Sequence, residues 1–180
     1  MQLDRGDIYW LEGRPQERGR STLLRWSPDG SIGEVVPPDF NVRSRVHEYG
    51  GGAYIVRNGS VYCVNFSDQR VYRIVAAEAL NSVSVPEALT PPGPCRYADF
   101  DVDVRRQRLV CVREDHTQEG REPINTIVSI PLGPAKRSDS PAEAGHYVHS
   151  EVIASGYDFY STPRLSPDGA KLAWLSWRHP

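Results

Sequence analysis

The stretch Gln107-Arg108-Leu109-Val110-Cys111-Val112 is a short apolar run that follows a turn, and the same pattern occurs three more times in the 180-residue chain. The equivalent residues Trp10, Cys63, Cys111 and Trp174 are 53, 48 and 63 residues apart. A strand unit that recurs about every 50 residues is typical of the blades of a β-propeller. The other three copies are Gly6-Asp7-Ile8-Tyr9-Trp10-Leu11, Gly59-Ser60-Val61-Tyr62-Cys63-Val64 and Ala170-Lys171-Leu172-Ala173-Trp174-Leu175.

Further short apolar runs lie between these copies, and turn residues separate them. Asn58-Gly59 predicts a two-residue hairpin turn, while Ser27-Pro28-Asp29-Gly30 and Ser166-Pro167-Asp168-Gly169 predict type I turns. A short helix is expected only around Ala76–Leu80, and a loop over 133–145. The predicted strands are Asp7–Glu12, Thr22–Trp26, Gly33–Val36, Gly52–Val56, Ser60–Asn65, Arg70–Val75, Tyr97–Asp103, Arg108–Arg113, Thr126–Pro131, Glu151–Ala154, Thr162–Leu165 and Lys171–Trp177.

These strands predict an all-β fold. We expect a partial β-propeller of about three to four blades, each a four-stranded antiparallel sheet. The alternative is a β-sandwich with irregular strand spacing. In the propeller interpretation, the chain holds a first unit without its innermost strand, two complete units and half of a fourth. Since propellers usually close with about four to eight blades, residues 1–180 are expected to be an incomplete propeller domain from a longer or split protein. The outer faces of its first and last blades should expose apolar side chains.

Composition excludes several classes of function. Lys and Arg number 21 against 23 Asp and Glu, and the net charge of −2 gives no reason to expect a nucleic-acid partner. No apolar run approaches the roughly 20 residues that span a bilayer, and the charged N-terminus is unlike a signal peptide, so we expect no membrane partner and a cytoplasmic protein. Three cysteines without a CxxC pair indicate neither a disulfide framework nor a zinc site.

No metal ion or other cofactor is expected. His116, His146 and His149 lie in polar loops without a second ligand at a suitable spacing. Asp99, Asp101 and Asp103 alternate along one predicted strand, but no glycine-centred calcium loop surrounds them. We therefore expect these three carboxylates to face solvent or the propeller tunnel.

One segment carries a family resemblance, the string Arg45-Val46-His47-Glu48-Tyr49-Gly50-Gly51-Gly52-Ala53-Tyr54. It resembles the propeller of the prolyl oligopeptidase family, in the dipeptidyl aminopeptidase/acylaminoacyl-peptidase-like branch. Two further segments share this resemblance: Phe40-Asn41-Val42-Arg43 and Asp158-Phe159-Tyr160-Ser161-Thr162-Pro163-Arg164-Leu165-Ser166-Pro167-Asp168-Gly169. The similarity extends over essentially the whole chain. It implies a propeller, commonly seven-bladed, that covers an α/β-hydrolase domain whose Ser-Asp-His triad cleaves short peptides.

The sequence departs from that family in one respect, because the 180 residues contain no G-x-S-x-G nucleophile motif. The α/β-hydrolase catalytic domain is therefore expected to be absent, and no catalytic residue is assigned. The resemblance then implies a substrate-gating part of a serine peptidase, itself non-catalytic, whose partners are the hydrolase domain and short peptides. The alternatives are a non-catalytic propeller that serves as an interaction scaffold, and a metal-dependent propeller lactonase.

Two groups of residues are candidates for a substrate-gating or domain-interface site. Arg45, His47, Glu48 and Tyr49 precede three glycines, and a loop of this kind could place them at the tunnel mouth, where a carboxylate pairs with a peptide α-amino group and a guanidinium with a carboxylate. Alternatively, Arg45 and Glu48 form an ion pair that only orders the loop. The second group is Tyr157, Asp158 and Arg164, which could line a peptide pocket, although aromatic residues between blades are usually core.

Overall fold

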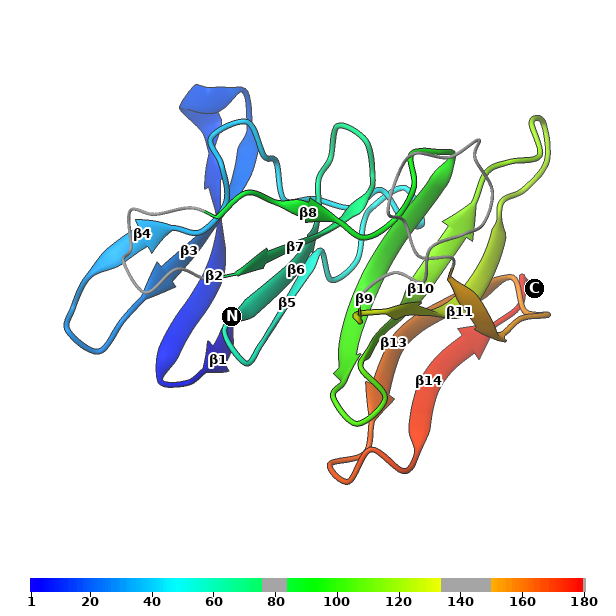
Figure 1. Ribbon diagram of the computed structural model, residues 1–180. Coiled ribbons are helices and arrows are strands. Elements are labelled where there is room, and N and C mark those ends of the chain that lie inside the picture. The colour runs from blue at the N-terminus through cyan, green and yellow to red at the C-terminus, as the bar shows by residue number, and fades with distance from the viewer. Residues whose placement is uncertain (76–83, 134–149, 180) are drawn as a thin grey trace, which may run out of the picture.

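The computed structural model of the chain describes residues 1–75, 84–133 and 150–179. Its strands form separate antiparallel sheets that stand side by side in chain order (Figure 1). The elements are β1 (Gln2–Asp4), β2 (Asp7–Arg14), the 3₁₀ turn η1 (Pro15–Glu17), β3 (Arg20–Trp26), β4 (Ile32–Glu34), β5 (Tyr54–Arg57), β6 (Ser60–Val64), β7 (Val71–Val75), β8 (Glu87–Ala88), β9 (Cys95–Asp103), β10 (Arg108–Asp115), β11 (Ile124–Pro131), β12 (Glu151–Ala154), β13 (Phe159–Leu165) and β14 (Leu172–Trp177).

Each sheet is a simple meander, as expected for a propeller blade. The first sheet has the order β1-β2-β3-β4, the second β5-β6-β7-β8 and the third β9-β10-β11-β12, while the fourth pairs β13 with β14. The repeat residues Trp10, Cys63, Cys111 and Trp174 lie on β2, β6, β10 and β14, the second strand of each sheet. Strands β1, β5, β9 and β13 contact one another in that order and form the inner wall of the partial ring. The all-β, partial-propeller prediction is confirmed.

The structure corrects the prediction at the shortest elements. The first sheet does have its innermost strand, β1, which pairs with β2. Strand β8 and η1 were also not predicted, because two or three residues are too few to show a hydrophobic period. The helix predicted at 76–80 lies outside the described residues, as does all but the first residue of the loop predicted over 133–145.

The predicted turns have the expected geometry. Asn58 and Gly59 have φ values of +53° and +73°, the left-handed pair that a tight hairpin needs. The amide of Gly30 donates to the carbonyl of Ser27 at 2.8 Å, and that of Gly169 to the carbonyl of Ser166 at 2.7 Å. These bonds close both four-residue turns.

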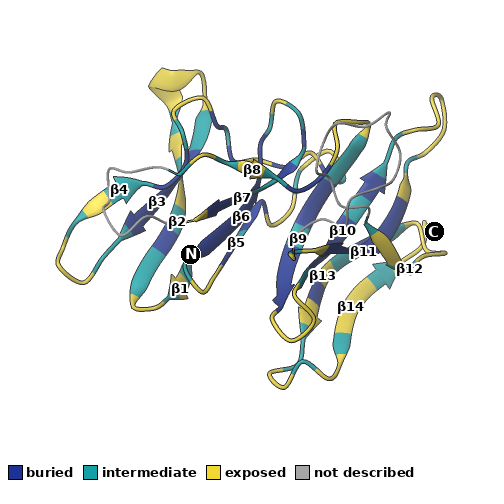
Figure 2. Cartoon of the chain, viewed as in Figure 1, coloured by how far each residue is buried: buried dark blue, intermediate teal, exposed yellow. Residues whose placement is uncertain are grey.

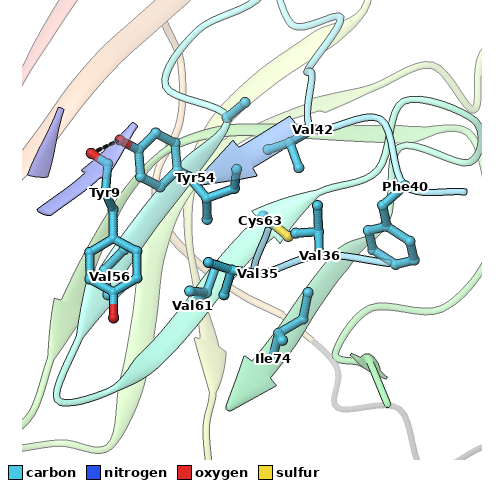
Figure 3. Packing of buried hydrophobic residues seen from close by; sticks show 12 residues of the cluster. Tyr9, Val35, Val36, Phe40, Val42, Tyr54, Val56, Val61, Cys63 and Ile74 are labelled. Atoms are coloured by element: carbon cyan, nitrogen blue, oxygen red, sulfur yellow. Dashed lines mark hydrogen bonds between the residues drawn. The ribbon is translucent and has the colours of Figure 1, made fainter. Parts of the chain in front are cut away.

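The hydrophobic core lies between the sheets rather than within one layer. One cluster joins the first and second sheets, and there the Tyr54 hydroxyl donates to the carbonyl of Tyr9 at 3.1 Å (Figure 3). A second cluster joins the second and third sheets, and a third joins the third and fourth. Each Val, Leu or Ile buried in this way contributes roughly 1.5–3 kcal/mol to stability.

The strands of the two middle sheets are buried more fully than those of the fourth sheet (Figure 2). Neighbours cover both faces of the middle sheets, so all of β6 and residues 109–112 of β10 are buried. The outer sheets have a free face, where Ile32, Leu175 and Trp177 are exposed. The expected apolar outer faces are therefore present.

Two of the three cysteines behave as small hydrophobic core residues. Cys63 and Cys111 are buried and free, and burial raises the pKa of the Cys63 thiol to about 12 and that of Cys111 well above its usual range. Cys95 is half-buried and also free. Within the described ranges, none of the helical segments has the length and apolar character that crossing a membrane requires.

Candidate functional site

The connections that lead into β5, β9 and β13 lie at one end of the partial ring, which we call the entry end. The pairing of Cys95 with Asp115 and of Phe159 with Trp177 shows that β10 and β14 finish at this end. The long connection from β4 to β5 contains the segment 45–50, which we call the entry loop. Its neighbours at this end are the start of β9, the end of β10 and both strands of the fourth sheet.

The entry loop has an unusual backbone. His47 and Glu48 have φ values of +54° and +66°, in the left-handed region that non-glycine residues seldom adopt. The amide of Gly50 donates to the carbonyl of Val46 at 2.8 Å, and Gly50 itself has a φ of +85°. A Cβ at Gly50 would lie 2.9 Å from the carbonyl oxygen of Ser44, so the chain needs glycine here.

His47 points into the molecule instead of toward the tunnel mouth. Only 7% of its side chain is exposed. Its Nε2 lies 3.1 Å from the carbonyl oxygen of Tyr160 on β13, and its Nδ1 lies 3.6 Å from Oε1 of Glu114 on β10. The residue His47 therefore joins the loop that leads into the second sheet to the third and fourth sheets.

Glu114 is the polar centre of the entry end, and the sequence analysis did not identify it. Its side chain is 4% exposed, and its Oε1 also accepts a hydrogen bond from the backbone amide of His47 at 3.1 Å. Its Oε2 lies 2.8 Å from Nε2 of His116 and 3.4 Å from Nη1 of Arg96. Burial acts to raise the pKa of this carboxyl, but the hydrogen bonds from His47 and His116 outweigh it and lower the pKa to about 2.

Glu48 binds Arg96, which corrects the expected alternative of an Arg45–Glu48 ion pair. The Arg96 Nη1 group donates to Oε1 of Glu48 at 2.7 Å and to the carbonyl oxygen of Arg45 at 3.0 Å. The Arg45 guanidinium instead lies 4.2 Å from the centre of the Phe66 ring. The Glu48 side chain remains 82% exposed, so its carboxylate is fixed in position while staying accessible.

An aromatic patch lies at the entry end and begins with Tyr49, the residue after Glu48; its other members are Phe159, which is half-buried, and the exposed Trp177 and His179. The Phe159 and Trp177 rings are stacked with centroids 5.3 Å apart, and the His179 ring is 4.8 Å from Phe159. The buried His47 ring connects Tyr49 to this pair, at 5.9 Å from Tyr49 and 5.3 Å from Phe159. Tyr49 is 78% exposed and Trp177 is 40% exposed.

The second predicted group is only partly brought together. Tyr157 is exposed at the entry end, where the Arg178 guanidinium lies 5.1 Å from its ring centre. Asp158 lies beside it and accepts a hydrogen bond from the amide of His179 at 2.9 Å. Arg164 lies farther along β13 and donates to backbone carbonyls of Phe100 and Pro163 at 3.4 and 2.7 Å. The core interpretation is therefore wrong for Tyr157.

The three aspartates of β9 accept hydrogen bonds from neighbouring strands or turns. Asp99 accepts from the amide of Gly52 at 2.6 Å through Oδ1 and from the amide of Thr162 at 3.0 Å through Oδ2. Asp101 accepts from the amide of Leu165 at 2.8 Å. Asp103 is buried and bonded to arginines. The expected solvent- or tunnel-facing position is thus wrong for Asp101 and Asp103, which are both buried.

A cleft of about 370 Å³ lies at the opposite end of the ring from the entry loop. It separates the β9–β10 turn from the β13–β14 turn, with Arg57 beside it. In the described ranges, no group of three His, Cys, Asp or Glu side chains could hold a metal ion. His116 is bonded to Glu114, and His146 and His149 lie outside the described residues.

Comparison with known proteins identifies similar solved structures. A crystal structure of puromycin hydrolase matches with a TM-score of 0.83 and 31% identity, covering 99% of this chain and 27% of that one. A serine-to-alanine mutant of puromycin hydrolase complexed with PGG matches with a TM-score of 0.82 and 31% identity, over 97% and 27% of the two chains. A puromycin-hydrolyzing peptidase of Mycobacterium tuberculosis matches with a TM-score of 0.79 and 33% identity, over 98% and 27%.

The chain thus spans 27% of the length of each of these proteins. No family model matches it, and no curated protein does.

Proposed function

Because this chain belongs to the prolyl oligopeptidase family, in which it corresponds to the N-terminal propeller portion of a peptidase, we propose that it controls which substrates reach a serine peptidase domain. The remaining blades and the α/β-hydrolase domain would lie in parts of the protein outside these 180 residues. The propeller portion itself would perform no catalysis. Three free cysteines, two of them buried, fit a protein of the reducing cytoplasm.

The entry end is the surface that we assign to the catalytic domain and the incoming peptide. The observation that carries this proposal is the accessible Glu48 carboxylate beside the aromatic patch. Exposed aromatic side chains that lie together commonly mark interaction surfaces. The cleft at the opposite end lacks such a patch among the residues that line it.

The chemistry of the entry end suits a short peptide with a free N-terminus. Arg96 holds Oε1 of Glu48, and the exposed remainder of that carboxylate could accept hydrogen bonds from a peptide α-ammonium group. The rings of Tyr49 and Trp177 could pack against the first apolar side chains of the peptide. Arg45, exposed over Phe66, is available for a peptide carboxylate. A folded protein would not reach these groups once a second domain covered them.

This function predicts a kinetic difference in the intact peptidase that contains the chain. Tyr49→Ala and Glu48→Gln should each lower kcat/KM for short aminoacyl substrates by about tenfold, the equivalent of one lost contact of about 1.4 kcal/mol. The 180-residue chain alone should not hydrolyse an aminoacyl chromogenic substrate.

The matched control is Glu119→Gln, an exposed carboxylate beyond β10, which should leave kcat/KM unchanged. Equal kinetics for all three variants would contradict the assignment of the entry end. Turnover by the isolated chain that a serine-directed inhibitor abolishes would contradict its non-catalytic role.

A further inference from the structure

Both ring nitrogens of His47 face hydrogen-bond acceptors. Nε2 lies 3.1 Å from the Tyr160 carbonyl oxygen, which can only accept, so Nε2 must carry a proton. Nδ1 is buried, lies 3.6 Å from the Glu114 carboxylate and has no hydrogen-bond partner. A neutral imidazole has one N–H group and would direct the lone pair of Nδ1 at a buried carboxylate. Only the imidazolium gives both nitrogens a proton to share.

We propose that His47 is a doubly protonated imidazolium that holds the second, third and fourth sheets together and fixes the entry loop, so that the positions of Glu48 and Tyr49 depend on its protonation. The carboxylate that it contacts is on the third sheet, and the carbonyl is on the fourth. The ring is also packed 6.1 Å from the centre of Trp177. His47 is therefore a positioning residue for the exposed groups of the entry end.

The backbone of the entry loop explains why it needs such an anchor. Left-handed φ values at His47 and Glu48 are unfavourable for residues other than glycine and persist only where surrounding contacts impose them. The hydrogen bond from the His47 amide to Glu114 and the two contacts of its ring oppose this cost, together with the bonds of Arg96 to Glu48 and to the Arg45 carbonyl. When the ring loses its proton at Nδ1, the contact with Glu114 becomes repulsive and the loop is free to relax.

The surroundings of His47 favour the charged ring on balance. The nearby Glu114 carboxylate raises its pKa above the ordinary 6.5, burial acts in the opposite direction, and the Tyr160 carbonyl raises it further. The resulting stabilisation is complete below pH 6.5 and is lost as the pH rises through the elevated pKa.

Several titratable or charged groups surround the ring. They are Glu114 on β10, His116 beyond it, Arg96 and Asp99 on β9, Glu48 and Tyr49 on the entry loop, and Tyr160 and His179 of the last segment.

The test is an NMR titration of the ¹⁵N-labelled chain from about pH 5 to about pH 9, which covers the range where histidines titrate. The His47 ring, identified by its loss in His47→Gln, should show two protonated nitrogens at neutral pH. Above the His47 midpoint, the protection of the Gly50 amide against exchange with solvent, corrected for the pH dependence of the intrinsic rate, should fall about tenfold, because its bond to Val46 opens. A neutral ring with one tautomer at neutral pH would overturn the proposal.

The matched control is His116→Gln, which removes the other histidine on Glu114 but leaves both ring contacts of His47. This variant should keep the pH-dependent protection of the Gly50 amide, whereas in His47→Gln the protection should be low at every pH. High protection of Gly50 at every pH in His47→Gln would show that the ring does not fix the loop. If His47→Gln does not fold, the ring nitrogens of the unaltered chain, assigned by their proximity to Trp177, still decide the protonation state.

Discussion

Replacing Glu114 with alanine is expected to lower the free energy of unfolding by about 3–5 kcal/mol, because the change leaves buried charges without their partner. The carboxylate accepts from the amide of His47 and contacts His47, His116 and Arg96, which come from the entry loop, the end of β10 and the start of β9. Its loss therefore loosens the contact between the entry loop and the third sheet, and with it the position of the His47 ring against the fourth sheet. Urea denaturation followed by tryptophan fluorescence measures the change.

Two comparisons show whether charge or packing is responsible. Glu114→Gln keeps the acceptor for the His47 amide and should cost less than Glu114→Ala, while exposed Glu119→Ala should stay within about 0.5 kcal/mol of the unaltered chain. In the unaltered chain, the Glu114 pKa of about 2 against the ordinary 4.5 stabilises the fold above pH 4.5, and this contribution is lost as the pH falls toward 2. An effect of Glu114→Ala as small as that of Glu119→Ala would show that the network does not contribute to stability.

Replacing Asp99 with alanine is expected to lower the free energy of unfolding by about 2–4 kcal/mol, since hydrogen bonds to a charged group contribute roughly 1.5–3 kcal/mol each. The Asp99 carboxylate binds the amide of Gly52 on one side and that of Thr162 on the other. Asp99 also has a φ of +57°, which alanine tolerates less well than aspartate. The same urea titration measures the loss.

Asparagine at this position is the informative control. Asp99→Asn tolerates the left-handed backbone and keeps one acceptor, so it should lose about half as much stability as Asp99→Ala. Exposed Asp39→Ala should change little. If Asp99→Ala is as stable as Asp39→Ala, water replaces the carboxylate at both amides, and Asp99 does not hold the inner strands together.

Local sequence patterns were sufficient to predict most of the fold. The recurring run around Trp10, Cys63, Cys111 and Trp174 located the second strand of every sheet, since a strand covered on both faces must be apolar along its length. The turn at Asn58-Gly59 was equally predictable, because few residues accept its backbone angles. Strands β1 and β8 were not, since their pairing depends on neighbours and not on a pattern of their own.

The site was less predictable because its contacts join residues far apart in the sequence. The string around His47 drew attention to the entry loop, yet nothing local shows that Arg96, 48 residues beyond Glu48, would bind that carboxylate in place of Arg45. Glu114 continues an apolar strand and has no motif around it. The one available signal was the position of Glu114 shortly after the apolar run at 109–112, which is buried in the structure. A carboxylate that continues a buried strand requires a partner for its charge.

The proposal that the entry end faces the catalytic domain is tested most directly by thiol labelling. A Tyr49→Cys variant is made in a Cys95→Ser background, and the labelling rate of its thiol is compared between the 180-residue chain and the intact peptidase. A Val104→Cys variant at the opposite end is the control. We predict that the thiol at position 49 reacts with a maleimide at least about tenfold more slowly in the intact protein, while the thiol at position 104 reacts equally fast in both. Equal labelling at position 49 in both proteins, or slow labelling at position 104 alone, would contradict the account.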